Sequence, residues 1–197
     1  MRIAVLGATG ATGQLLVTTA LERGLDVVAL VRDPARVTGV EAAAVDVHDP
    51  DSIARAVKDC DVLLSGLGGG PGTLTAGARA AVASGVPRII WLGAVGTGQS
   101  ARAGGIVTRA LMKTAMRKEL PDKENADSTI IAFGGTVFHA GMLGNGPVAP
   151  ARRTLTLAEA PSRMFPASVS RATVAAAMVD EAVRPRFPGM VVLPVQR

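Results

Sequence analysis

The sequence predicts an α/β protein with a doubly wound parallel sheet and helices on both faces. Three observations predict it. A short apolar run at residues 1–6 passes directly into a glycine-rich stretch and then into a helical pattern. Apolar runs of strand length then alternate with helical patterns, joined by short connections. The chain has 197 residues, which suits a single domain spanning 1–197.

The expected elements follow from these patterns in chain order. Pro121 should kink the helical pattern around it or open a new helix. A segment rich in Gly and Pro, residues 140–166, is expected to be an irregular flap on the substrate side, with one strand-like piece at 154–158. The other expected strands are 1–6, 26–31, 42–45, 61–65, 88–92, 136–139 and 190–193. The expected helices are 14–21, 49–58, 73–84, 106–118, 122–133 and one that starts at Ser168 or Ser170 and ends near 183.

Composition excludes several classes of protein. Hydrophobic residues make up 48% of the chain, which argues against disorder. The net charge of +5 is spread along the chain without interleaved aromatic residues, so we expect no nucleic-acid binding. No stretch is long and apolar enough for a membrane span, and we expect no membrane partner and no metal site. Cys60 is the single cysteine, which favours a reduced, cytoplasmic setting. The oligomeric state stays open.

The glycine-rich stretch at residues 7–13 predicts a dinucleotide site. It lies where a buried strand turns into a helix, and pyrophosphate needs close backbone approach and free N–H groups at a helix N-terminus. This is the first turn of a Rossmann fold. The contacts expected here are Gly7, Thr9, Gly10, Ala11, Thr12 and Gly13.

The end of the second strand distinguishes NADP from NAD. An acidic residue there would bind the adenosine ribose diol, but this chain has Arg32. A guanidinium suits the 2′-phosphate of NADP(H), and Arg36 lies close enough to help. The alternative is that Arg32 is a surface residue paired with Asp33. We therefore expect NADP(H) as cofactor.

The ends of later strands should complete the cofactor site, because ligands bind at this edge of such sheets. Asp46 could border the adenine, or it could only cap its loop. Glycines after the fourth strand would let the backbone pass near the pyrophosphate and the nicotinamide ribose. The residues expected here are Asp46, Val47, Gly66, Leu67, Gly68 and Gly93.

These residues resemble the atypical short-chain dehydrogenase/reductase superfamily. More narrowly, the chain resembles the NmrA-like NAD(P)-binding group, which includes biliverdin-IXβ and flavin reductases. The stretch at 7–13, the Val31-Arg32-Asp33 step and Asp46-Val47 carry the resemblance, and 136–141 with 145–147 extend it. It implies a reductase whose acceptor needs little acid–base help from side chains.

The chain departs from the superfamily at the catalytic residues. Gly93 or Ala94 stands at the position of the usual serine, and the chain has no tyrosine. Glu119 occupies the tyrosine position, so a Ser-Tyr-Lys mechanism is excluded by composition. Lys123 remains, and the resemblance implies that it holds the nicotinamide ribose; alternatively it is a charge on a helix face.

The sequence therefore predicts an NADPH-dependent oxidoreductase acting on a planar, conjugated small molecule of the flavin or quinone type. His139, at the end of the sixth strand, could act as general acid, or it could be hydrogen-bonded to the backbone of a loop. Met142 and Leu143 are candidates for the substrate pocket. Two other functions stay open: an NmrA-like protein that senses NADP(H) without catalysis, and a biosynthetic isomerase or cyclase on the same fold.

Overall fold

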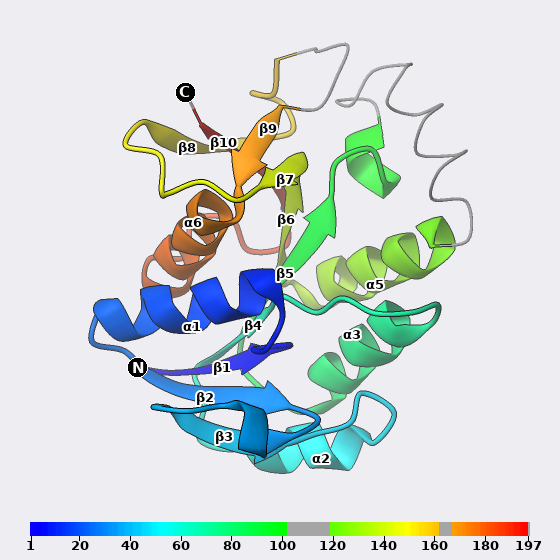
Figure 1. Cartoon of the computed structure of the whole chain (residues 1–197). Helices are drawn as coiled ribbons and strands as arrows, with labels where there is room; N and C mark the ends of the chain where they lie inside the picture. Colours follow the sequence, from blue (N-terminus) through cyan, green and yellow to red (C-terminus); the bar gives the residue numbers. More distant parts are fainter. Residues whose placement is uncertain (102–118, 162–166, 197) are drawn as a thin grey trace.

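An eight-stranded sheet forms the centre of the protein, with a separate pair of short strands beside it (Figure 1). The computed structural model describes residues 1–101, 119–161 and 167–196. In spatial order the large sheet contains β3 (Glu41–Ala44), β2 (Asp26–Val31), β1 (Arg2–Leu6), β4 (Val62–Ser65), β5 (Ile89–Ala94), β6 (Thr136–Ala140), β10 (Val191–Gln196) and β8 (Arg152–Thr156). The small sheet pairs β7 (Met142–Gly144) with β9 (Ser168–Ser170).

Helices cover both faces of the large sheet, as predicted. On one face α1 packs against α6, and on the other α3 packs against α5 and α2. Two short 3₁₀ helices, η1 and η2, follow β2 and β5. The bounds are α1 (Ala11–Glu22), η1 (Pro34–Arg36), α2 (Pro50–Ala56), α3 (Thr73–Ala83), η2 (Gly98–Ala101), α5 (Leu120–Phe133) and α6 (Arg171–Val183). Among the described residues, no helix is long and apolar enough to cross a membrane.

The two layers of helices create two apolar cores, one on each face of the sheet. In β1 the side chains of Ile3 and Val5 enter one core, and those of Ala4 and Leu6 enter the other. All four are at most 2% exposed. Successive side chains of a strand point to opposite faces, so a strand covered on both sides must be apolar throughout. This explains the uninterrupted apolar runs.

Local signals in the sequence begin the helices where expected. Asp49 accepts the N–H of Ser52 and caps α2, while Ser170 accepts the N–H of Thr173 and caps α6. Pro121 lies in the first turn of α5, where its missing N–H costs nothing, so it opens a helix instead of kinking one. The predicted helix at 106–118 lies outside the described residues.

The described part of the segment at 140–166 contains more strand than predicted, although 145–151 and 157–161 are irregular as expected. β7 pairs with β9, and β8 pairs antiparallel with β10, with Leu155 opposite Leu193. The strand β8 overlaps the predicted piece at 154–158 but begins and ends two residues earlier, at Arg152 and Thr156. The two adjacent arginines at the start of β8 interrupt the apolar pattern by which a strand is predicted. Charged residues are common on edge strands because they discourage pairing with other chains.

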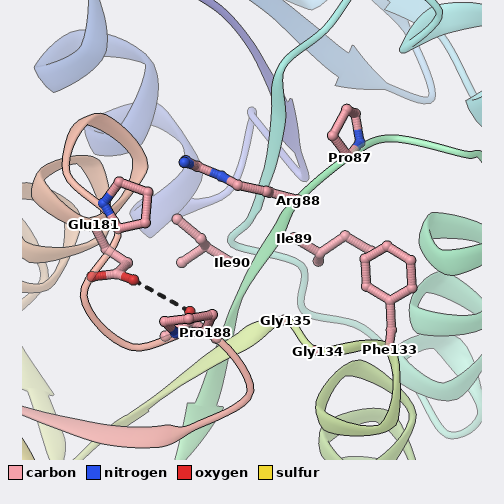
Figure 2. Close-up of a pocket in the computed structure, with 11 residues that line it drawn as sticks. Pro87, Arg88, Ile89, Ile90, Phe133, Gly134, Gly135, Glu181 and Pro188 are labelled. Carbon is pink, nitrogen blue, oxygen red and sulfur yellow. Dashed lines mark hydrogen bonds between the residues drawn. The ribbon is translucent and has the colours of Figure 1, made fainter.

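At the edge where β5 and β6 begin, a buried carboxylate fastens the loop between α6 and β10. Glu181 is 2% exposed, and its carboxylate accepts the N–H groups of Arg186 and Phe187 at 2.9–3.1 Å. The hydroxyl of Thr136, at the start of β6, lies 3.5 Å from the same carboxylate, and the dashed line from Glu181 in Figure 2 marks this hydrogen bond. The adjoining cavity of about 70 Å³ is too small for a nucleotide. This edge therefore has a structural role.

Candidate nucleotide-binding site

A cavity of about 590 Å³ lies at the carboxyl ends of β1, β2 and β4. This is the edge where open α/β sheets bind ligands. Most of the residues predicted for the cofactor gather here. Five predicted residues lie outside the lining: three at the start of α1, together with Gly93 and Lys123. The lining comprises Leu6, Gly7, Thr9 and Gly10 after β1, Leu30, Val31, Arg32 and Arg36 around the end of β2, and 45–48, 66–70 and Thr73.

The three glycines of the opening motif have different physical tasks. Gly7 has φ of +76°, which disfavours other residues, and its carbonyl accepts the N–H of Gly10 at 2.9 Å. At Gly13 a Cβ atom would overlap the backbone of Gly7. Gly13 therefore lets α1 pack directly on the turn, while Gly10 leaves the backbone open to the cavity.

The N-terminus of α1 is prepared for an anion. Gly10 caps this helix without a side-chain hydrogen bond, and the first turn contains no acidic residue. The positive end of the helix dipole therefore remains available. Thr12 and Gly13 are buried and Ala11 is exposed, and none of the three residues lines the cavity. Any part that they take in binding must come from their backbone N–H groups.

Two arginines line the part of the cavity beside β2. Arg32 and Arg36 are exposed, and among the described residues no carboxylate lies within 4 Å of either guanidinium. The carboxylate of Asp33 instead accepts the N–H of Ala35 at 3.1 Å and caps η1. The alternative pairing of Arg32 with Asp33 is therefore not found, and both arginines can face an anionic ligand.

Asp46 combines the two interpretations that the sequence left open. It lines the cavity with Val47, and its carboxylate also accepts the N–H of His48 at 2.9 Å. Ser52 holds the backbone of Asp46 through the hydroxyl, at 3.0 Å from the Asp46 N–H. Sequence reasoning missed His48, Gly69, Gly70 and Thr73 as lining residues, although the run of three glycines at 68–70 was a usable signal.

His139 does not lie in this cavity, so the structure does not support the expectation that it donates a proton to substrate. Its side chain is 1% exposed. Nδ1 lies 2.6 Å from the hydroxyl of Ser100, and Nε2 lies 2.9 Å from Oδ2 of Asp127. Both ring nitrogens are thus occupied inside the protein, by two side chains and not by the loop backbone that the alternative expected.

The surroundings of His139 form a buried polar cluster, which we define as Thr97, Ser100, Asp127 and His139. The Thr97 hydroxyl lies 3.3 Å from Oδ2 of Asp127, while Oδ1 has no hydrogen-bond partner among the described residues. A Cβ at Gly93 would come within 2.7 Å of His139 and 2.9 Å of Asp127. Gly93 therefore makes room for the cluster and lies outside the cavity lining.

Lys123 is half-buried near the start of α5 and also lies outside the cavity lining. It precedes Asp127 by one helical turn and so shares its face of the helix. The neighbouring Asp122 accepts the N–H groups of Leu74 at 3.1 Å and Thr75 at 2.8 Å, which ties α5 to the start of α3. The ribose contact of Lys123 stays a prediction.

Neither of the predicted substrate residues after β6 lines the cavity. Met142 is 65% exposed, and Leu143 packs against the core on the α1 and α6 side.

Comparison with solved structures shows the same fold throughout. A Burkholderia pseudomallei protein named as a candidate exported protein matches with 27% identity and a TM-score of 0.84, over 99% of both chains. ChuY, named an anaerobillin reductase, from Escherichia coli O157:H7 matches at 22% identity and TM-score 0.81, over 100% of this chain and 97% of its own. A short-chain dehydrogenase/reductase from Veillonella parvula in complex with NADP matches at 17% and 0.78, over 99% and 94%.

Comparison of the sequence with curated proteins found no match. The sequence pattern of the family described as NAD(P)H-binding matches residues 7–185. That match starts at the glycine turn and includes every residue that lines the cavity after Leu6. The chain therefore belongs to the NAD(P)H-binding family, which agrees with the NAD(P)-binding group that the sequence resembles.

Proposed function

We propose that this protein is an NADPH-dependent oxidoreductase that reduces a planar, conjugated small molecule of the flavin or quinone type. The observation that carries the proposal is the cavity at the ends of β1, β2 and β4. It combines a glycine turn, a helix N-terminus that no side chain caps, and two arginines without a described carboxylate partner. Together these groups suit a pyrophosphate and one further phosphate.

The arginines favour NADPH over NADH. Arg32 and Arg36 can both reach a 2′-phosphate, since both line the cavity beside the end of β2. Asp33 lies outside the cavity lining and accepts the N–H of Ala35, which does not favour a contact with the ribose diol of NADH. A charge-assisted hydrogen bond contributes about 1.5–3 kcal/mol, which corresponds to roughly 10- to 100-fold in affinity.

The chemistry must proceed without a tyrosine acid, because the chain has none. The dinucleotide supplies a hydride, and a flavin or quinone that accepts this electron pair can take its proton from water. The protein then has to hold the two rings in contact and exclude competing acceptors. ChuY, a similar structure, is named an anaerobillin reductase, and another, from Streptococcus pneumoniae, is named for NADH-flavin reduction. These names support the class of substrate.

A turnover assay tests the proposal. Oxidation of NADPH is measured by absorbance against riboflavin, FMN, FAD and menadione, and then repeated with NADH. We expect turnover with at least one acceptor and kcat/KM for NADPH at least about tenfold above NADH. Arg32→Gln should remove most of this preference by weakening NADPH alone. Arg184→Gln, an exposed arginine outside the cavity, is the matched control and should change nothing.

The burial of His139 also favours a second candidate, a protein that senses NADP(H) without catalysis. With this ring enclosed and tyrosine absent, the predicted acid–base residues of the site reduce to Lys123. A sensor would bind NADP⁺ and NADPH with clearly different affinities and oxidise NADPH with none of the acceptors. Calorimetry with both cofactor forms, combined with the turnover assay, separates the two functions.

A further inference from the structure

A second large cavity lies at the opposite end of the sheet from the nucleotide cavity. It measures about 600 Å³ and lies between β8, α6 and the loop after α6. Figure 1 shows β8 and α6 far from β3 and α2, which flank the other cavity. Its charged and aromatic lining residues are Arg152, Arg153, Glu159, Asp180, Arg186 and Phe187.

Arg152 lines this cavity and is paired with a carboxylate beside it. One of its terminal nitrogens lies 3.3 Å from Oδ2 of Asp180, whose other oxygen accepts from Arg23 at 2.6 Å. Asp180 is therefore already compensated by two guanidinium groups. The Nε atom of Arg152 is buried and has no hydrogen-bond partner among the described residues. This atom has almost no accessible surface, so what Arg152 contributes to the cavity is its positive charge.

The other two arginines of the cavity lack an ion-pair partner among the described residues. No described carboxylate lies within 4 Å of the guanidinium of Arg153 or Arg186. Arg186 lies over the ring of Phe187, 4.9 Å from its centre, and this contact restricts its position. Arg186 is thus partly ordered before a ligand arrives.

The carboxylate of Glu159 is occupied locally. It accepts both the N–H and the hydroxyl of Thr156, each at 2.8 Å. These hydrogen bonds, with a smaller effect of the Arg153 charge, hold the pKa of Glu159 below its ordinary value. Three guanidinium groups therefore face two carboxylates that are both engaged, and the cavity carries an excess of positive charge.

We propose that this cavity is a second ligand site, which binds a small dianion carrying carboxylate or phosphate groups. The planar fork of arginine matches both groups through paired N–H donors. The two exposed guanidinium groups of Arg153 and Arg186 supply such donors, and Arg152 adds positive charge beside them. The site is separate from the cofactor, so the proposal does not depend on the reaction.

Calorimetric titration of the full-length protein tests this proposal. The probes are inorganic phosphate, pyrophosphate, succinate and citrate, with excess NADP⁺ present to fill the nucleotide cavity. We expect binding of at least one probe, weakening as salt is added. The double variant Arg153→Gln/Arg186→Gln should weaken it by at least about tenfold, the effect of losing one charge-assisted hydrogen bond or more. The class of probe that binds identifies the recognised group.

Arg184→Gln is the matched control, since Arg184 is exposed, close to Arg186 in sequence and outside the lining. It removes one positive charge from the same region and should leave the affinity within about twofold. Both arginines of the double variant are themselves exposed, so these changes should not prevent folding. Equal affinity in the double variant and the control, or no binding of any probe up to roughly 10 mM, would overturn the proposal.

Discussion

Two neighbouring regions at the carboxyl ends of the parallel strands are built in opposite ways. At the ends of β1, β2 and β4, backbone and arginine groups face an open cavity and keep their hydrogen-bonding capacity for a ligand. At the ends of β5 and β6, the cluster of Thr97, Ser100, Asp127 and His139 is buried, and its groups bind one another. The first region is organised for binding and the second for holding the fold together.

The difference concerns function directly, because both regions contain residues that could have served catalysis. A histidine beside a carboxylate and a serine looks like a proton-transfer arrangement when only residue types are considered. Its burial argues against that use, since a group with 1% exposure cannot touch a substrate without rearrangement. We therefore expect substitutions in the buried cluster to lower mainly the stability of the protein, and substitutions at the cavity to lower mainly the affinity for the nucleotide.

His139→Leu should cause the largest loss of stability. It leaves the carboxylate of Asp127, which is 6% exposed, without its histidine partner. Leaving a buried acceptor without its hydrogen-bond partner costs about 1–3 kcal/mol, and more when the acceptor is charged. Chemical denaturation should show this decrease in the free energy of unfolding, while calorimetry below the transition shows NADPH affinity within about twofold of the parent.

Ser100→Ala is the milder companion, and should cost about 1 kcal/mol because it removes one hydroxyl from the same cluster. If His139→Leu unfolded like the parent but lost NADPH oxidation, His139 would be catalytic and the contrast between the regions would collapse.

Gly13→Ala should damage binding more than any change in the buried cluster. A methyl group here overlaps the backbone of Gly7 and pushes α1 away from the turn. We expect NADPH affinity to fall about a hundredfold, the loss of one or two charge-assisted hydrogen bonds, and stability to fall by about 1–3 kcal/mol. Gly68→Ala is the control for stability, because a Cβ at Gly68 meets nothing within 4 Å. Equal effects of the two changes would contradict the packing role of Gly13.

The nucleotide site could be predicted from sequence because its parts are local. A strand, a glycine turn and a helix follow one another within the first 22 residues, and the turn itself places the helix N-terminus at the strand end. Arg32 could be predicted for the same reason, since its position at the end of β2 follows from the strand boundary alone. The alternating apolar patterns placed the other strands of the parallel sheet and the described helices within a few residues.

The remaining features depend on contacts between distant segments. His139 binds Ser100, 39 residues earlier, and Asp127, 12 residues earlier, and no pattern in the sequence indicates those pairings. β8 is a strand only because β10 offers it an edge, and its arginines conceal the apolar alternation. Its partner β10 extends to Gln196, three residues beyond the predicted strand. Side-chain partners and edge strands are set by tertiary structure, so propensity alone could not place them.

Asp122→Asn tests the junction between α3 and α5 through its dependence on pH. Burial opposes ionisation of this carboxyl, but the hydrogen bonds donated by Thr75 and Leu74 prevail and hold the pKa of Asp122 below its ordinary value. Because the pKa is lower in the folded state, the ionised carboxylate stabilises the protein at pH values above the unfolded-state pKa of about 3.9. That stabilisation is lost as the pH falls through the folded-state pKa.

We therefore expect Asp122→Asn to cost about 1–2 kcal/mol at neutral pH and the difference from the parent to shrink below about pH 4. Thermal unfolding over a series of pH values measures it. A difference that stayed constant with pH would show that the charge of Asp122 is irrelevant and that only its shape matters.

Arg36→Gln should have the smallest effect. Both arginines beside β2 are exposed, but Arg36 lies in the last turn of η1, while Arg32 directly follows the strand. A solvated charge at the rim of a site contributes up to about 1 kcal/mol, so NADPH affinity should fall about threefold and the loss should shrink with added salt. NADH affinity should not change, since NADH lacks the phosphate. If Arg36→Gln weakened NADPH as much as Arg32→Gln, the phosphate would lie between the two guanidinium groups, and selectivity would belong to the pair instead of the strand end.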